Sequence, residues 1–206
     1  EDNMDEVIWN YINDGLSDDF IMGYLQVLYN KNGSEWFIKK IEGVNSVEKL
    51  ISLLCAPMYN KEIAEYVETL SQNVQKKYWE MVKLWGYTPD DAMSLIDKML
   101  SVNRVDVALE IIHHIKLKVQ INDKLKFECL SQLLTTSAGQ FKRADMILYI
   151  TDLVKELDRS EDPEVMEKLP QVELLLYPIL EQRVDVGKLR LMHAILHQPS
   201  LLMELI

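Results

Sequence analysis

Glycine and proline are scarce in this sequence, which has 7 Gly and 6 Pro among 206 residues. Together they make up about half of the roughly 12% that soluble proteins contain on average. A fold built from many short strands needs more turn-forming residues than that. The scarcity therefore excludes a turn-rich all-β architecture and favours an all-α one.

Cysteines and long apolar runs are also lacking. The two cysteines, Cys55 and Cys129, stand far apart in apolar patterns, so no disulfide framework and no CxxC metal or redox motif is expected. They fit reduced core residues of a cytoplasmic protein. The longest apolar run, Leu174 to Leu180, contains a proline and is shorter than the roughly 18 residues that span a bilayer. The sequence thus predicts no membrane contact.

Positive charge is in short supply, with 22 Lys and Arg against 33 Asp and Glu and a net charge of −11. Binding of a phosphate backbone requires a basic surface, so no nucleic-acid partner is expected. The densest basic stretches, Lys116 to Lys126 and Lys142 to Arg143, alternate with apolar residues and predict solvated helix faces. Because the glycines are scattered singly, the phosphate-binding loops of nucleotide cofactors are absent, and we expect no cofactor and no small-molecule ligand.

Apolar residues recur at spacings of three and four along almost the whole chain, which indicates amphipathic helices. Thr88-Pro89-Asp90-Asp91 is typical of a helix start, with a hydroxyl cap, a proline in the first turn and acids at the positive helix end. Asn32-Gly33 predicts a helix stop, and Lys116 to Ile121 predicts an extended connection. The expected helices lie near residues 7–12, 17–28, 34–41, 46–56, 60–70, 71–85, 89–100, 105–115, 125–134, 144–157, 170–180 and 189–196.

Helix pairs start near Thr88, Asn122 and Asp162, at a spacing of roughly 33 to 40 residues that is typical of helical repeats. We therefore predict an all-α fold, an irregular α-α superhelix (a HEAT-like solenoid) of short antiparallel helix pairs. A compact bundle of the same helices is the alternative. The prediction treats residues 1–206 as one domain with a sub-boundary near 57–60. Because the sequence starts at Glu1 and stops at Ile206 on an apolar helical face, we expect a piece of a longer chain.

Residues with catalytic chemistry are sparse. His193 and His197 are four apart on an expected helix, as zinc ligands are, but Ala194 stands where a metalloprotease has Glu, and no further ligand lies nearby. We predict no metal there and two partly exposed histidines instead. His113 and His114 should point in different directions, one packed and one solvated. No nucleophile motif is present, so no enzymatic activity is expected.

Aromatic and methionine side chains offer the best candidate binding surface. Tyr78, Trp79, Trp85 and Tyr87 form the densest aromatic group. Residues of these types are enriched in binding surfaces, although large side chains at helical spacing usually form a core. The wider group that could line a groove adds Met58, Tyr59, Tyr66 and Met81.

Several segments resemble a helical region of large bacterial multidomain proteins, some with ATP-binding parts and suspected defence roles. The segments that carry the resemblance are Tyr78-Trp79, Arg104 to Leu109, Val172 to Leu180, Leu189 to His193 and Gln198 to Ile206. The resemblance covers roughly the last two thirds of the chain and involves mostly packing residues. It implies that any NTPase activity lies outside this segment.

These observations predict a non-catalytic helical scaffold or protein-recognition domain within a larger bacterial protein. Its partner would be another protein or other domains of the same polypeptide. One alternative is a sensor or regulatory module of a defence-type ATPase. A second is a metal- or small-ligand-binding enzyme domain.

Overall fold

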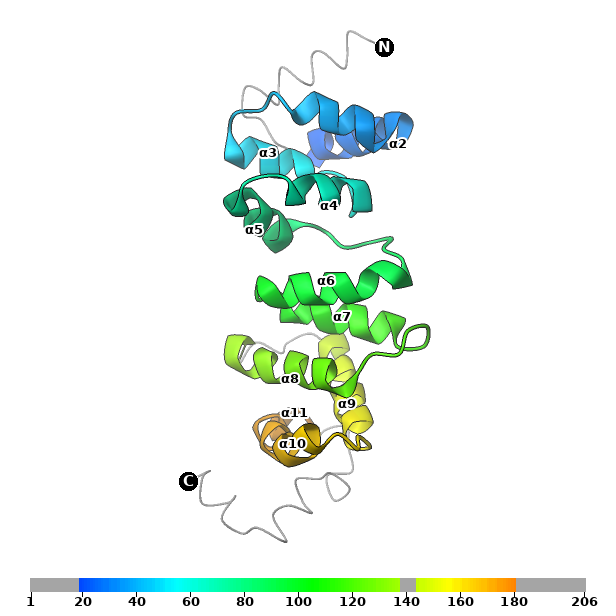
Figure 1. The fold of residues 1–206 in the computed structure, drawn as a ribbon, viewed down its shortest axis with the longest axis vertical. Coiled ribbons are helices and arrows are strands. Elements are labelled where there is room, and N and C mark those ends of the chain that lie inside the picture. Colours follow the sequence, from blue (N-terminus) through cyan, green and yellow to red (C-terminus); the bar gives the residue numbers. More distant parts are fainter. Residues whose placement is uncertain (1–18, 138–143, 181–206) are drawn as a thin grey trace. The chain divides into compact units, whose positions relative to one another are not determined.

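The computed structural model describes residues 19–137 and 144–180, and all regular secondary structure in this part of the chain is helical (Figure 1). This confirms the all-α prediction. The helices are α2 (Asp19–Ile41), α3 (Val47–Leu54), α4 (Lys61–Glu68), α5 (Gln72–Met81), α6 (Pro89–Ser101), α7 (Val105–Ile115), α8 (Asp123–Ser137), α9 (Ala144–Leu157), α10 (Pro163–Leu175) and α11 (Tyr177–Leu180).

The chain divides into two compact units, Glu1–Asp91 and Ala92–Ile206. The division falls in the first turn of α6, so the start of that helix belongs to the first unit. The sub-boundary expected near residues 57–60 lies inside the first unit, in the connection between α3 and α4.

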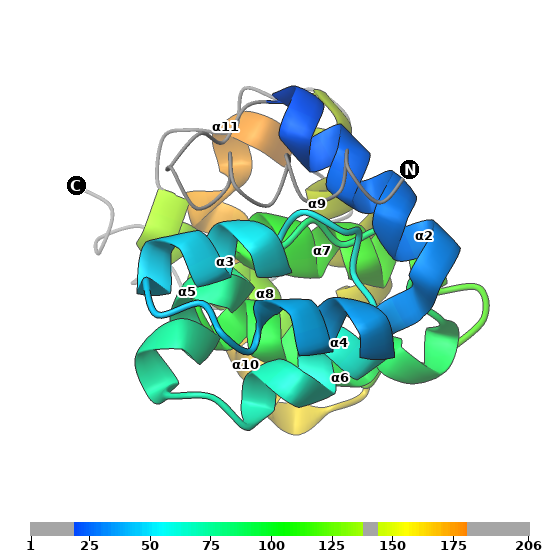
Figure 2. The ribbon, with the colours of Figure 1, turned by 90° about the horizontal axis from the view of Figure 1, so that it is seen from above.

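In the first unit, α2 packs against α3 and α4, and α5 packs against α3 and α4. Helix α2 is broken at Gly33, whose φ of 83° and ψ of 175° leave the helical region. The two halves of α2 consequently lie at a wide angle to one another (Figure 2). The Asn32-Gly33 pair thus stops one helix and starts another, because glycine tolerates a positive φ at little steric cost.

Local capping chemistry sets the helix starts of the first unit. The Asn60 side chain accepts hydrogen bonds from the backbone N–H groups of Glu62 and Ile63 at 2.8 and 3.2 Å, which starts α4. At the start of α6, the Thr88 hydroxyl donates to the Asp91 carboxylate at 2.6 Å and accepts from the Asp91 N–H at 3.4 Å. Hydrogen bonds from Thr88 lower the pKa of Asp91. Asp91 is therefore a helix-end stabiliser, as the sequence predicts.

The core of the first unit is made of side chains at the helical spacings read from the sequence. Its largest fully buried members are Tyr78, Phe37, Leu25, Ile41, Leu53, Leu54 and Ile63. One helix is shorter than predicted, because α5 ends at Met81 and Val82 takes an extended conformation with ψ of 136°. Residues 82–88 then form a connection, where the prediction had about one more helical turn up to residue 85.

In the second unit, α7 packs against α8 and α9, α8 packs against α9 and α10, and α11 packs against α9 and α10. The side chain of Gln132 on α8 ties α6 to this group, since its amide donates to the Leu100 carbonyl at 3.2 Å. The core consists mainly of branched aliphatic side chains. Its most buried members include Ile96, Met99, Leu109, Ile111, Cys129, Leu130, Ile150, Val154, Leu157, Val165 and Leu169.

The start of helix α10 differs from the start that we predicted from the sequence. We expected a helix start at Pro170, but the Asp162 side chain accepts from the N–H groups of Glu164 and Val165, and Pro163 occupies the first helical position. Pro170 lies inside α10. Lys116 to Ile121 connects two helices, as expected, but the prediction that it is extended is wrong: Lys116 keeps helical angles, and the N–H groups of Lys118 and Val119 donate to the Ile115 carbonyl at 2.7 and 2.9 Å. The described residues contain no strand.

Candidate functional site

The four aromatic side chains singled out in the sequence are divided between the core and the surface of the first unit. Tyr78 is 1% exposed and Trp79 is 5% exposed, whereas Trp85 is 66% exposed and Tyr87 is half-buried. The rings of Tyr78 and Trp79 meet edge to face at 5.0 Å, and Trp79 Nε1 donates a hydrogen bond to Glu68 Oε1 at 2.9 Å. Tyr78 and Trp79 are therefore core residues and cannot belong to the predicted interface, because this face of α5 is buried in the unit. Trp85 and part of Tyr87 stay open to a partner.

Two connections of the first unit, residues 55–60 and 82–88, lie beside each other next to these rings. The Cys55 sulfur lies 4.0 Å from the Tyr78 carbonyl oxygen, and the Tyr59 N–H donates to the Lys83 carbonyl at 3.1 Å. We call the contact between these two connections the seam. Met58 and Tyr59 lie on one of the connections, Trp85 and Tyr87 lie on the other, and Met81 directly precedes the second.

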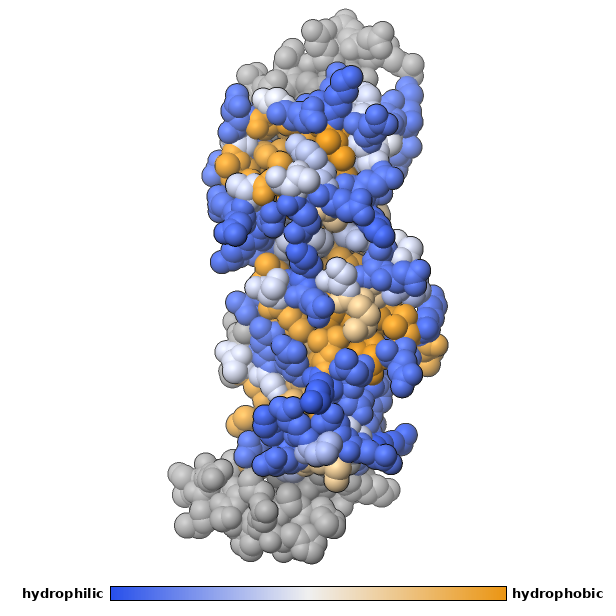
Figure 3. Space-filling view, in the orientation of Figure 1, coloured by the Kyte–Doolittle hydropathy of each residue, from blue (hydrophilic) through white to orange (hydrophobic). Residues whose placement is uncertain are grey.

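Three large apolar side chains project from the seam toward solvent. Met58 and Met81 are each 56% exposed, and Trp85 is 66% exposed. Side chains alternate between faces in an extended segment, and since Val82 is fully buried and Lys83 is exposed, Trp85 points outward. We name Met58, Met81 and Trp85 the methionine–tryptophan surface. Figure 3 shows that polar side chains cover most of the visible face of this unit, with an apolar area over α3.

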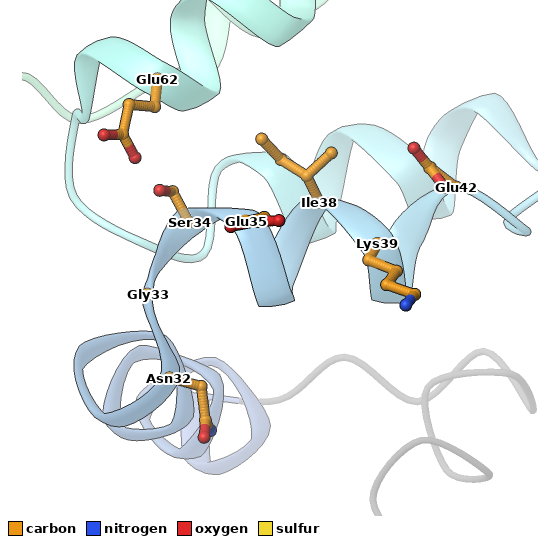
Figure 4. A pocket seen from close by; sticks show the side chains of 8 residues that line it. All are labelled: Asn32, Gly33, Ser34, Glu35, Ile38, Lys39, Glu42 and Glu62. Atoms are coloured by element: carbon orange, nitrogen blue, oxygen red, sulfur yellow. The ribbon is translucent and has the colours of Figure 1, made fainter.

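A pocket of about 760 Å³ opens at the bend of α2 (Figure 4). Asn32 lies on one side of the Gly33 bend and Lys39 on the other, while Glu62 extends from α4 on the side where Ser34 lies. The lining is completed by two more carboxylates on α2 and by an isoleucine. The full set is Asn32, Gly33, Ser34, Glu35, Ile38, Lys39, Glu42 and Glu62.

Carboxylates dominate the charge of this pocket. Among the described residues, Glu35, Glu42 and Glu62 form no ion pair within 4.0 Å, with Lys39 or with any other cation. Three carboxylates against one lysine leave the lining with an excess of negative charge, which favours a cationic group. We did not predict this pocket, because its carboxylates come from two helices, and its only sequence signal is the helix break at Asn32-Gly33.

A network of ion pairs joins α7, α8 and α9 in the second unit. Lys116 Nζ lies 3.2 Å from Asp152 Oδ2 and 3.1 Å from Glu156 Oε1. Lys126 Nζ lies 3.3 Å from Glu156 Oε2 and 3.2 Å from Asp123 Oδ1. The side chains of Lys116 and Lys126 are only 23% and 13% exposed. This corrects the expectation that both lysines lie on solvated helix faces, because they bridge helices instead.

His113 lies at the edge of this network, while His114 is exposed, which confirms the expected division between one packed and one solvated histidine. The His113 ring stacks on Tyr149 with centroids 4.2 Å apart, and its Nδ1 lies 3.8 Å from Asp152 Oδ2. Burial, reinforced by the charge of Lys116, lowers the pKa of His113 despite the opposing effect of Asp152. The neutral form of the imidazole is therefore favoured.

Metal and nucleophile chemistry finds no support in the part of the chain that the structure describes. No group of three or more His, Cys, Asp or Glu there could hold a metal ion. His193 and His197 lie outside the described residues. Burial raises the pKa of the Cys129 thiol to about 12, so this cysteine is a core residue rather than a thiolate. None of the described helices is both long and apolar enough to cross a membrane.

Comparison with family models, with curated proteins and with solved structures finds no match for this chain. Three features of the described residues are candidates for a functional role: the methionine–tryptophan surface, the pocket beside α2 and the ion-pair network of the second unit.

Proposed function

We propose that this chain is a non-catalytic protein-recognition or scaffold domain of a larger protein, built as an irregular α-α superhelix. Support for the superhelix comes from the order of packing within each unit. The helices that pack most closely are consecutive in sequence or separated by one helix, as in α2–α4, α3–α5, α7–α9 and α8–α10. Repeat proteins pack in this way, because each element contacts only its neighbours in the stack.

The observation that carries the recognition proposal is the exposure of Met58, Met81 and Trp85 at one seam. Tryptophan is among the side chains that contribute most to binding energy in protein interfaces, and methionine adapts its shape to a partner. The seam itself is held by the Tyr59–Lys83 hydrogen bond and by the buried Val82 beneath it. The three side chains are thus presented on a supported backbone.

A photo-crosslinking residue placed at position 85 tests this proposal in cells that contain the full-length protein. The matched control carries the same residue at Lys40, which is also exposed but lies on the second half of α2. We expect one discrete protein adduct from position 85 and none from position 40. The identified partner is then purified, and its affinity is measured for the wild type and for Trp85→Ser.

An affinity that falls about tenfold or more in Trp85→Ser would support recognition at this surface, since a single aromatic hot spot contributes about that much. Equal affinities for the two proteins would contradict it. The sensor module of a defence-type ATPase and the metal- or small-ligand-binding domain stay predictions, because no contact among the described residues favours either one.

A further inference from the structure

His113 and Lys116 on α7 approach the same carboxylate oxygen on α9. Asp152 Oδ2 lies 3.2 Å from Lys116 Nζ, which is hydrogen-bond distance, and 3.8 Å from His113 Nδ1, which is too long for a hydrogen bond. His113 Nδ1 is buried and has no hydrogen-bond partner among the residues that the structure describes. One acceptor thus lies near two possible cations, and the lysine holds it.

The ion-pair network around this oxygen holds one more negative charge than positive ones. Its members are three carboxylates and two ammonium groups, namely Asp123, Asp152, Glu156, Lys116 and Lys126. Their charges sum to −1 as long as the imidazole of His113 is neutral. A proton on the ring would make the sum zero, and both Asp152 and Glu156 act to raise the pKa of His113. The network therefore attracts a proton to this ring.

Burial of the ring and the charge of Lys116 oppose this attraction. The titratable and charged groups that face the ring are His114 and Lys116 from α7 and Tyr149, Asp152 and Glu156 from α9. Helix α8 takes part through Lys126, which pairs with Glu156 at 3.3 Å. Burial is the largest of these effects, and the pKa of His113 is lowered as a result. The closed contact between α7 and α9 therefore favours the neutral ring.

Protons bind more tightly to a state in which the His113 ring is surrounded by water. In water the pKa of a histidine is about 6.5, above its value in the closed contact. Acid therefore raises the population of any state that exposes the ring. Only 24% of the His113 side chain is exposed in the closed contact, and Tyr149 of α9 stacks on the ring at 4.2 Å. Full exposure of the ring thus requires α7 and α9 to move apart locally.

We propose that His113 is a pH-sensitive switch at the contact between α7 and α9. With a neutral ring, Asp152 stays paired with Lys116 and the contact is closed. When His113 takes up a proton from solvent, its Nδ1–H donates to Asp152 Oδ2, and Lys116 retains only Glu156. Two cations then lie next to each other in a partly buried contact, and this loosens α9 from α7. The switch lies in the second unit and does not depend on the recognition function proposed for the first.

An NMR titration of the His113 ring in the full chain tests the competition for Asp152. The signal is assigned by its loss in His113→Gln. Asp152→Asn removes the attraction and should lower the midpoint of the titration, whereas Lys116→Gln removes the competing cation and should raise it. The matched control is Lys155→Gln, which removes the same charge from an exposed position of α9 and should leave the midpoint in place.

Hydrogen exchange of the backbone amides of α9 measures the opening itself. The rates are expressed as protection factors, so that the pH dependence of the exchange chemistry cancels. Between pH 7 and pH 5.5 the protection of α9 should fall in the wild type, by up to about tenfold per pH unit below about 6.5. His113→Gln has no proton to take up at this position, so its α9 should stay equally protected across the same range.

Two results would overturn the inference. One is a His113 midpoint that fails to move in opposite directions in Asp152→Asn and Lys116→Gln. The other is a protection of α9 that does not fall with pH in the wild type, or that falls as much in His113→Gln. Circular dichroism at pH 7 verifies that each variant is folded, and the two midpoints decide the matter without His113→Gln if that variant is not.

Discussion

Separate alanine substitutions of Trp79 and Trp85 test how the structure divides the aromatic residues of the first unit. Trp79 is 5% exposed, packs on Tyr78 and donates a hydrogen bond to Glu68. Removal of a buried tryptophan side chain costs about 3–5 kcal/mol of the free energy of unfolding. Trp85 is 66% exposed, so its replacement should change that free energy by no more than about 0.5 kcal/mol.

The assay is urea unfolding followed by circular dichroism, with thermal unfolding as a second measure. For a unit of this size, a loss of 3 kcal/mol corresponds to a decrease in the melting temperature of about 12–24 °C. Trp79→Phe retains most of the packing but loses the hydrogen bond, so about 1–2 kcal/mol is expected and the variant should still fold. Similar losses in Trp79→Ala and Trp85→Ala would refute the assignment of one residue to the core and the other to the surface.

Three further substitutions test the second unit and the bend of α2. Glu156→Gln should lower the free energy of unfolding by about 1–2 kcal/mol, because one carboxylate pairs with both Lys116 and Lys126; equal urea midpoints would contradict the network. His113 has a pKa below its usual value in the folded state, so the folded protein binds fewer protons than the unfolded one near pH 6. The free energy of unfolding should therefore rise with pH across the window from the lowered pKa up to about 6.5, and this rise should be smaller in His113→Phe. Gly33→Ala should lower the free energy of unfolding by about 1–2 kcal/mol, because an L side chain is strained at a φ of 83°. No atom lies within 4 Å of the added Cβ, so the cost comes from the backbone conformation alone. An unchanged melting temperature would contradict this strain.

The helix starts could be predicted from the sequence because capping is local chemistry. Asn60 and Thr88 each hydrogen-bond to N–H groups two or three residues away, so the pattern that makes the cap is visible in a few letters. Helix α9 begins and ends where its apolar spacing indicates, at Ala144 and Leu157. The two prolines near α10 show the limit of this reasoning, since Pro163 and Pro170 both resemble a first-turn residue and only the Asp162 cap selects one.

Contacts between distant segments were decided by the tertiary structure. Lys116 and Glu156 are forty residues apart, and no local pattern pairs them, so the lysines of this stretch were read as solvated. The pocket carboxylates likewise come from two helices, α2 and α4, which are separated by α3 in the sequence.

Composition and helical spacing alone therefore determine that the described chain is all-α, because both act within one or two turns of backbone. Trp79 and Trp85 are six residues apart and equally apolar, and the sequence assigns them to one surface. Their separation follows from the end of α5 at Met81 and from the Tyr59–Lys83 hydrogen bond, which turn one ring inward and leave the other exposed. A tertiary contact, rather than any property of the two side chains, thus selects the residue that is available to a partner.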